Sequence, residues 1–218
     1  MIEDESILYQ LRNVLRSKIW YSFFVQKKLD PKCRYEVKIL DWDNKKLIWS
    51  VVSIIDRVFF DGFRGMIVAM PNKRDKIEII VQKLSELSIS EIIFWPSDRS
   101  VIKNFNTKKY DRLNKISKEA VEQSWWWILP EIRFVDQLKS ILWNKKFIIF
   151  DKKENTIKQL SKADLVSIYW LVWPEWWLTD KDYQSFGNNF EIRHLGNTIL
   201  RTETAAIVWA WNIVNDKL

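Results

Sequence analysis

The first third of the chain alternates apolar and polar positions with the period of a β-strand. Residues 34–40 read Arg-Tyr-Glu-Val-Lys-Ile-Leu, and a second apolar stretch covers residues 46–55. Between them, Asp-Trp-Asp-Asn at residues 41–44 separates the two stretches as a hairpin turn would. A short helix is expected over residues 7–16, where three leucines recur at helical spacing. The pattern predicts a small β-rich domain over residues 1–70.

From Pro71 onward the apolar positions change to the period of a helix. Residues 77–87 and residues 113–121 each place their apolar side chains on one helical face. A final helix is expected over residues 202–214, with Thr202 as its N-cap.

Short, continuous apolar runs alternate with these helices. They lie at residues 91–94, 147–150, 168–172 and 191–195. Runs of this length are typical of strands buried on both faces, and strands alternating with helices favour a mostly parallel sheet. We therefore expect an α/β domain over residues 71–218.

Tryptophan and glycine occur in unusual proportions. The 218-residue chain has 14 Trp and 4 Gly, whereas average usage of about 7% predicts roughly 15 glycines. Several tryptophans also stand where turn chemistry favours glycine, as in the stretch LVWPEWWLTD at residues 171–180. We interpret most of the 14 positions as glycine encoded by UGA, a codon that some genetic codes reassign. A genuinely tryptophan-rich protein is the alternative.

Charge and cysteine content narrow the class of protein. The net charge of +7 favours an anionic partner, of which nucleic acid is the usual one. The single cysteine, Cys33, excludes an internal disulfide and suits a reducing compartment. The start MIEDESILYQ is acidic, and the sequence contains no run of 18 apolar residues, so we expect a cytoplasmic protein that does not span a membrane.

Two loops offer the most promising chemistry. His194 is the only histidine in the sequence. Almost no residues are therefore available for a histidine-based metal site or a Ser-His-Asp triad, and we expect no bound metal. Residues 171–180 and 194–205 each begin at the end of an expected strand, and the second stretch carries Gly196 and Arg201. With glycine at its tryptophan positions, the first loop would let its backbone pass close to a ligand. Open α/β sheets bind ligands at such strand ends.

These loops resemble the C-terminal motifs of the SPOUT RNA methyltransferases, and most closely those of the RsmE type. The Trp-Pro-Glu-Trp-Trp stretch at 173–177 aligns with a Gly-Pro-Glu-Gly-Gly motif, and Leu-Gly-Asn-Thr-Ile-Leu-Arg-Thr-Glu-Thr-Ala at 195–205 is similar to the family's most specific motif. Weaker similarities are Leu-Arg-Asn-Val-Leu-Arg at 11–16, the segment 76–87, Ser-Asp-Arg-Ser at 97–100 and Glu-Ala-Val-Glu-Gln-Ser at 119–124. The resemblance covers nearly the whole chain.

The resemblance implies a fold and an activity. It implies a PUA-like β-barrel that binds RNA, followed by a SPOUT domain with a parallel sheet and a deep trefoil knot, in a homodimer. The implied reaction is methylation of N3 of a uridine in small-subunit (16S) ribosomal RNA, with S-adenosylmethionine as the cofactor. The substrate would be the free RNA or the small ribosomal subunit.

The resemblance also implies site residues. Those expected to hold the cofactor are Leu171, Val172, Trp173, Pro174, Glu175, Trp176, Trp177, Leu195, Gly196, Ile199, Leu200 and Thr202. Because uridine N3 must lose its proton, Arg201 is expected to stabilise the anion or hold a phosphate, and Glu175 or Glu203 to act as base. Glu203 could instead favour the start of a helix. The candidate phosphate contacts are Arg12, Arg16, Lys18, Arg99 and Lys103.

Two departures from the family pattern keep alternatives open. The barrel strand that usually precedes the 11–16 motif is absent, so the barrel is abbreviated or the start codon is misplaced. Tryptophan at 173, 176 and 177 would fill the cofactor crevice, so the chain as written would not bind the cofactor. A non-catalytic RNA-binding protein with a degenerate knot is the main alternative. The others are a SPOUT enzyme acting on tRNA or a ribose hydroxyl, and a basic structural protein.

Overall fold

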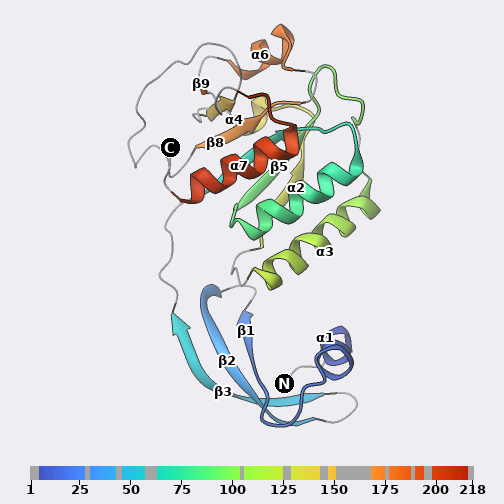
Figure 1. Cartoon of the computed structure of the whole chain (residues 1–218), viewed down its shortest axis with the longest axis vertical. Coiled ribbons are helices and arrows are strands. Elements are labelled where there is room, and N and C mark those ends of the chain that lie inside the picture. Colours follow the sequence, from blue (N-terminus) through green and yellow to red (C-terminus); the bar gives the residue numbers. More distant parts are fainter. Residues whose placement is uncertain are drawn as a thin grey trace. The chain divides into compact units, whose positions relative to one another are not determined.

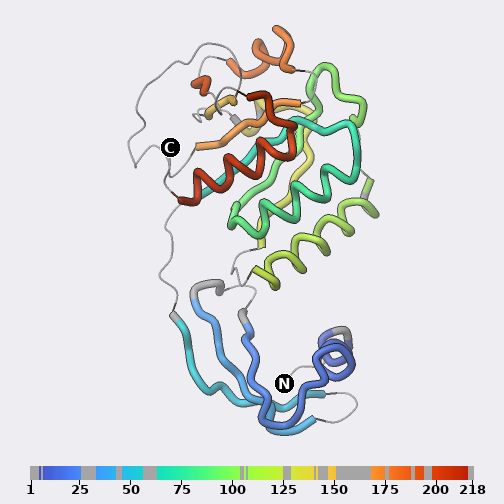
Figure 2. The backbone as a smooth tube through the Cα atoms, viewed as in Figure 1, coloured from blue at the N-terminus to red at the C-terminus, as the bar shows by residue number. Residues whose placement is uncertain are grey.

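The computed structural model divides the chain into two compact units, Met1–Phe60 and Asp61–Leu218. The residues that it describes are 5–27, 30–42, 46–56, 63–103, 106–124, 129–142, 147–150, 168–174, 177–187, 190–193 and 198–215. Figure 1 labels many of the elements of the two units, and Figure 2 follows the same chain as a tube.

The first unit is a three-stranded antiparallel sheet with a short helical segment. Its elements are α1 (Glu5–Tyr9), the π-helical turn η1 (Gln10–Val14), β1 (Ser22–Lys27), β2 (Asp30–Trp42) and β3 (Leu47–Asp56), with the strands in the order β1-β2-β3. Leu8 and Leu11 pack against Ile39 and Leu47, as the leucine spacing predicted. Leu15 does not join them, because the helical segment ends before it and leaves it 50% exposed.

The second unit is built on a six-stranded sheet. Its elements are β4 (Gly65–Ala69), α2 (Arg74–Glu86), β5 (Glu91–Trp95), α3 (Thr107–Gln123), β6 (Glu131–Phe134), α4 (Lys139–Leu142), β7 (Phe147–Phe150), β8 (Tyr169–Val172), α6 (Asp180–Phe186), β9 (Phe190–Arg193) and α7 (Thr202–Val214). The strand order is β6-β5-β4-β8-β7-β9, and every pairing is parallel. The α/β class with a parallel sheet is therefore confirmed.

Strand β4 lies at the centre of this sheet, between β5 and β8. The structural division between Phe60 and Asp61 thus falls earlier than the boundary predicted near Pro71, which left β4 in the first domain. All five residues of β4 are buried, as expected for a strand covered on both faces.

Helices cover both faces of the sheet. Figure 1 shows α7, α2 and α3 side by side across one face, where Leu84 and Ala206 belong to the same buried cluster as Val68. Because strand residues alternate between faces, Ile67 points to the opposite side and packs in a cluster with Phe186 of α6. None of the helices in the described ranges is long and apolar enough to cross a membrane.

A buried polar cluster joins the amino ends of β4, β5 and β8. Glu91 accepts a hydrogen bond from the Tyr169 hydroxyl at 2.6 Å and one from Arg133 at 2.9 Å. In the strand register Gly65 lies between Glu91 and Tyr169, and a Cβ atom at Gly65 would lie 2.5 Å from the Tyr169 ring. Burial, followed by the bond to Glu91, raises the pKa of Tyr169 well above its usual value.

Candidate functional site

At the carboxyl ends of the sheet, the loop that follows β4 is bonded to the end of β5 and to the loop that follows β5. The Met70 N–H donates to the Trp95 carbonyl at 2.7 Å. The Ser97 N–H donates to the Ser100 hydroxyl oxygen at 2.9 Å, and the Ser100 N–H donates back to the Ser97 carbonyl at 3.0 Å. Both serines are buried, so the Ser-Asp-Arg-Ser segment forms a tight, fixed turn.

The strand that leads into the predicted cofactor loop is part of the core. Leu171 and Val172 are fully buried, and their side chains pack in the core of the sheet. Pro174 is also buried. Glu175 and Trp176, predicted for catalysis and cofactor binding, lie outside the described residues.

Two indoles occupy the loop itself. Trp173 is 5% exposed, and its ring stacks on that of Trp177 with centroids 5.8 Å apart and planes 14° apart. Trp177 has a φ of +63°, a left-handed conformation that strains a bulky residue. The backbone N–H of Trp177 donates to the Pro174 carbonyl at 3.2 Å, and this bond closes the loop into a turn. The structure therefore brings Trp173, Pro174 and Trp177 together.

Helix α7 starts beside this loop. Arg201 is its N-cap residue, is exposed, and accepts a hydrogen bond at its carbonyl from the Ala205 N–H. The prediction that Thr202 caps the helix is wrong. Thr202 lies inside the first turn, and its buried hydroxyl donates to the Trp173 carbonyl at 3.1 Å. This bond ties the helix to the loop after β8.

The other predicted residues of this segment are more scattered. Ile199 is 58% exposed, whereas Leu200 packs against the core near the loop. Leu195 and Gly196 lie outside the described residues. Glu203 lies in the first turn of α7, and its carboxylate is 3.4 Å from the Lys76 ammonium of α2.

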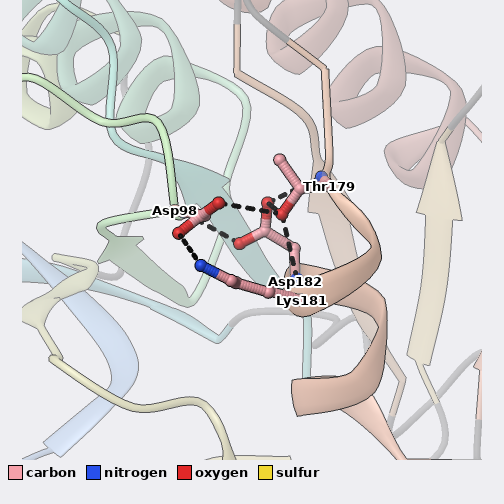
Figure 3. A network of polar contacts seen from close by, with 4 residues as sticks. All are labelled: Asp98, Thr179, Lys181 and Asp182. Atoms are coloured by element: carbon pink, nitrogen blue, oxygen red, sulfur yellow. Dashed lines mark hydrogen bonds and ion pairs between the residues drawn. The ribbon is translucent and has the colours of Figure 1, made fainter.

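A polar network joins the turn after β5 to helix α6 (Figure 3). Asp182, in the first turn of α6, accepts from the Asp98 N–H at 2.9 Å and from the Thr179 N–H at 2.8 Å. Thr179 in turn caps the helix by accepting from the Asp182 N–H, which completes a capping box. Sequence reasoning missed this network, although the spacing Thr-x-x-Asp at 179–182 is a recognisable capping signal.

The predicted phosphate contacts fall in both units. Arg16 and Lys18 are exposed in the first unit, where the Arg12 guanidinium lies 5.0 Å from the Trp42 ring centroid. In the second unit Arg99 is exposed beside Asp98, and Lys103 is exposed further along the same segment. Within the described ranges, no group of three or more His, Cys, Asp or Glu residues could hold a metal ion.

Comparison with known proteins identifies the family. Residues 64–213 match the model for the RNA methyltransferase domain. Ribosomal RNA small subunit methyltransferase E of Bacillus subtilis is 31% identical over 153 residues, which cover 62% of this chain and only 59% of that protein. Ribosomal RNA small subunit methyltransferase E 2 of Borreliella burgdorferi is 26% identical over 217 residues, covering 95% of this chain and 87% of that protein.

Solved structures share the fold. A ribosomal RNA small subunit methyltransferase E from Neisseria gonorrhoeae, bound to S-adenosyl methionine, superposes with a TM-score of 0.77 at 19% identity. The superposition covers 94% of this chain and 87% of that one. Because the family model matches more than half of the sequence, the chain belongs to the RNA methyltransferase domain family.

Proposed function

We propose that the chain transfers a methyl group from S-adenosylmethionine to N3 of a uridine in small-subunit (16S) ribosomal RNA. The observation that carries the proposal is the family match of residues 64–213, together with relatives named as ribosomal RNA small subunit methyltransferase E. The loops after β5 and β8 lie at the carboxyl ends of parallel strands, where α/β sheets bind ligands. The net charge of +7 supports an RNA substrate.

The protein must perform two tasks in the proposed reaction. The uracil ring must lose its N3 proton, and the negative charge that develops must be stabilised. Arg201 suits the second task, because it is exposed at the N-terminal end of α7, where the helix dipole adds positive potential. Glu175 is the better candidate for the base, since the Glu203 carboxylate is already paired with Lys76.

We propose that S-adenosylmethionine, the sulfonium methyl donor, lies against the backbone of the loop after β8. Leu171 and Val172 would contribute backbone groups, and Thr202 would hold the loop through its bond to the carbonyl of residue 173. The indoles of Trp173 and Trp177 stack on each other in this loop, and we expect them to obstruct the cofactor in the chain as written. The remaining proposed contacts are Pro174, Glu175, Trp176, Leu195, Gly196, Ile199 and Leu200.

We further propose that most of the 14 tryptophan positions carry glycine, encoded by UGA. Backbone conformation supports this at two positions. Among the described residues, four other than glycine have positive φ, and two of them are Trp20 at +74° and Trp177 at +63°. Glycine adopts such angles without steric cost, whereas a bulky side chain is a genuine outlier there.

Packing supports the same substitution in the core. The indole N–H groups of Trp49, Trp170 and Trp209 are buried and have no hydrogen-bond partner among the described residues. Buried Trp N–H groups usually find a partner. The ring of Trp209 also lies with its centroid only 3.3 Å from that of Phe150, whereas aromatic pairs prefer separations of about 4.5–7 Å.

Calorimetric titration of S-adenosylmethionine tests the cofactor and the recoding together. Three versions are compared: the chain as written, the chain with glycine at all 14 positions, and a matched control with glycine only at 173, 176 and 177. We expect both glycine versions that fold to bind, and the chain as written not to bind. UGG codons at those three positions in the gene would overturn the recoding.

A methylation assay tests the reaction. The version that binds the cofactor is incubated with labelled S-adenosylmethionine and either free 16S RNA or small ribosomal subunits. We expect 3-methyluridine by nucleoside mass spectrometry. A ribose-methylated product would contradict the proposed position of transfer. If instead every folded glycine version fails to bind the cofactor in the titration but binds RNA, the chain is a non-catalytic RNA-binding protein.

We propose that the first unit is a PUA-like RNA-binding domain. Its antiparallel sheet and the exposed Arg16 and Lys18 support this role. If each side chain contacts a phosphate, Arg16→Ala or Lys18→Ala should lower the slope of log affinity against log salt by about 1. An unchanged slope in both variants would move RNA binding elsewhere.

We also propose the homodimer and the trefoil knot that the resemblance implies. Helix α7 leaves Val208 exposed, at 36%, and this apolar side chain supports a partner surface there. Light scattering after gel filtration should give twice the chain mass, and a monomer would contradict the dimer. Residues 151–167 and 194–197 lie outside the described residues, so the knot rests on the resemblance.

A further inference from the structure

We propose that Asp182 positions the methyl-transfer site by fixing the loop after β8 against the turn after β5. The inference rests on the function proposed above, because that function assigns the loop after β8 to the cofactor. Asp182 lies between the two loops in Figure 3, is 3% exposed, and uses both carboxylate oxygens. It does not touch the reacting atoms and would act through the backbone of other residues.

The bond to Asp98 goes beyond helix capping. The capping box is complete with Thr179 and Asp182 alone, because each side chain binds the other's N–H. The second carboxylate oxygen of Asp182 binds the Asp98 N–H, 84 residues away in the sequence. Since β4 separates β5 from β8, this bond bridges loops whose strands stand about 10 Å apart. The Asp182 carboxylate therefore binds backbone groups of both loops at once.

The two loops are connected mainly through backbone N–H donors that bind Asp182, rather than through the surrounding side chains. Lys181 is 3.8 Å from the Asp98 carboxylate and is 80% exposed, so this ion pair contributes little. The single Thr179 hydroxyl proton is shared between oxygens of Asp98 at 3.3 Å and of Asp182 at 3.2 Å. In contrast, the two N–H bonds to the buried Asp182 carboxylate are short and assisted by its charge.

The two joined loops have different proposed partners. The turn after β5 presents Arg99, an expected phosphate contact, directly after Asp98. The loop after β8 is the proposed cofactor cradle. A shift of one loop against the other would displace the methyl donor relative to the RNA, and a misplacement of about 1 Å can cost about 100-fold in rate.

The experiment compares steady-state kinetics of four chains, all built in the version that binds S-adenosylmethionine. They are the parent, Asp182→Asn, Asp182→Glu and the control Lys181→Ala, which alters the same network at its exposed edge. In Asp182→Asn one of the two N–H groups faces the amide nitrogen, which cannot accept a hydrogen bond, so kcat at saturating cofactor and RNA should fall about tenfold or more. Lys181→Ala should stay within about twofold, because exposed ion pairs are weak.

A thermal midpoint, measured alongside, separates positioning from stability. A merely structural Asp182 would lower the midpoint and leave kcat per folded molecule unchanged, and that result would overturn the inference. If Asp182→Asn does not fold, Asp182→Glu decides. Glutamate is the usual capping-box residue at this position but is one methylene longer, so kcat should fall while the midpoint stays near the parent value. A parent that neither binds the cofactor nor methylates RNA overturns the proposed function, and the inference with it.

Discussion

At the amino ends of the strands, side chains of neighbouring strands converge on the buried carboxylate of Glu91. At the carboxyl ends, a second buried carboxylate, that of Asp182, binds backbone groups of two loops. The first arrangement is set by strand register alone, because Glu91 and Tyr169 stand on either side of Gly65. The second is set by loops, whose sequences can vary without disturbing the sheet. Variants at the two ends should therefore separate stability from function.

The largest effect is expected at the carboxyl end, from Arg201→Ala. If Arg201 stabilises the uracil anion, its loss should lower kcat/KM by about 10²–10³-fold, or about 2.7–4 kcal/mol. The free energy of unfolding should change by less than about 0.5 kcal/mol, because the side chain is exposed. Initial rates on 16S RNA and urea titrations measure the two quantities.

Arg201→Lys is the matched control, since it keeps the charge but loses the planar fork of donors. Its rate should fall between those of the parent and Arg201→Ala. An alanine variant with the parent's rate would remove Arg201 from the chemistry.

At the amino end, Gly65→Ala should cost about 3 kcal/mol of stability by overpacking. The added methyl would lie 2.5 Å from the Tyr169 ring and 2.7 Å from the Phe63 ring, in the central strand of the sheet. Urea unfolding measures the cost, and cofactor affinity per folded molecule should remain that of the parent. The same change in a Tyr169→Ala background should cost less, and an equal cost there would place the clash elsewhere.

Tyr169→Phe should cost about 1.5 kcal/mol, because Glu91 keeps Arg133 but loses its 2.6 Å bond. It should also change the pH dependence. Burial and the bond to Glu91 raise the pKa of Tyr169, so above about pH 10 the unfolded chain releases this proton before the folded one does. The parent's free energy of unfolding should then fall as pH rises, and the variant's should fall less steeply.

Urea titrations between about pH 9 and pH 11 bracket the ordinary tyrosine pKa and test this. Curves for parent and variant that run parallel over that range would contradict the assigned role of the Tyr169 hydroxyl.

The sequence was most informative where structure is local. The apolar runs at 91–94 and 147–150 became β5 and β7, because a strand between two helical layers is buried on both faces. The same reasoning could have placed β4, whose continuous Met-Ile-Val-Ala run differs from the alternating strands before it. Its proximity in sequence to those strands led to the later predicted boundary.

The sequence was least informative where partners are distant. Glu91 meets Tyr169 across 78 residues, and Asp182 meets Asp98 across 84, and no local pattern encodes either separation. Thr202 shows how a local rule is overridden. Threonine at a helix start is a typical N-cap, but a carbonyl 29 residues earlier takes its hydroxyl, and Arg201 becomes the cap residue instead.

The smallest effect on stability and cofactor affinity is expected when Thr202 loses this hydrogen bond. Thr202→Val keeps the shape of a buried side chain but removes its bond to the carbonyl of residue 173, at a cost of about 1 kcal/mol. If the bond holds the cofactor loop in place, the affinity for S-adenosylmethionine should fall by about fivefold, the equivalent of that energy. Calorimetry and urea titration of the same samples measure both. Thr202→Ser keeps the hydroxyl and should retain the affinity, whereas an equal loss in the serine variant would assign the effect to the methyl group's packing. The loop would then depend on the core beneath it, and the separation between the two ends of the sheet would be less complete than their hydrogen bonds indicate.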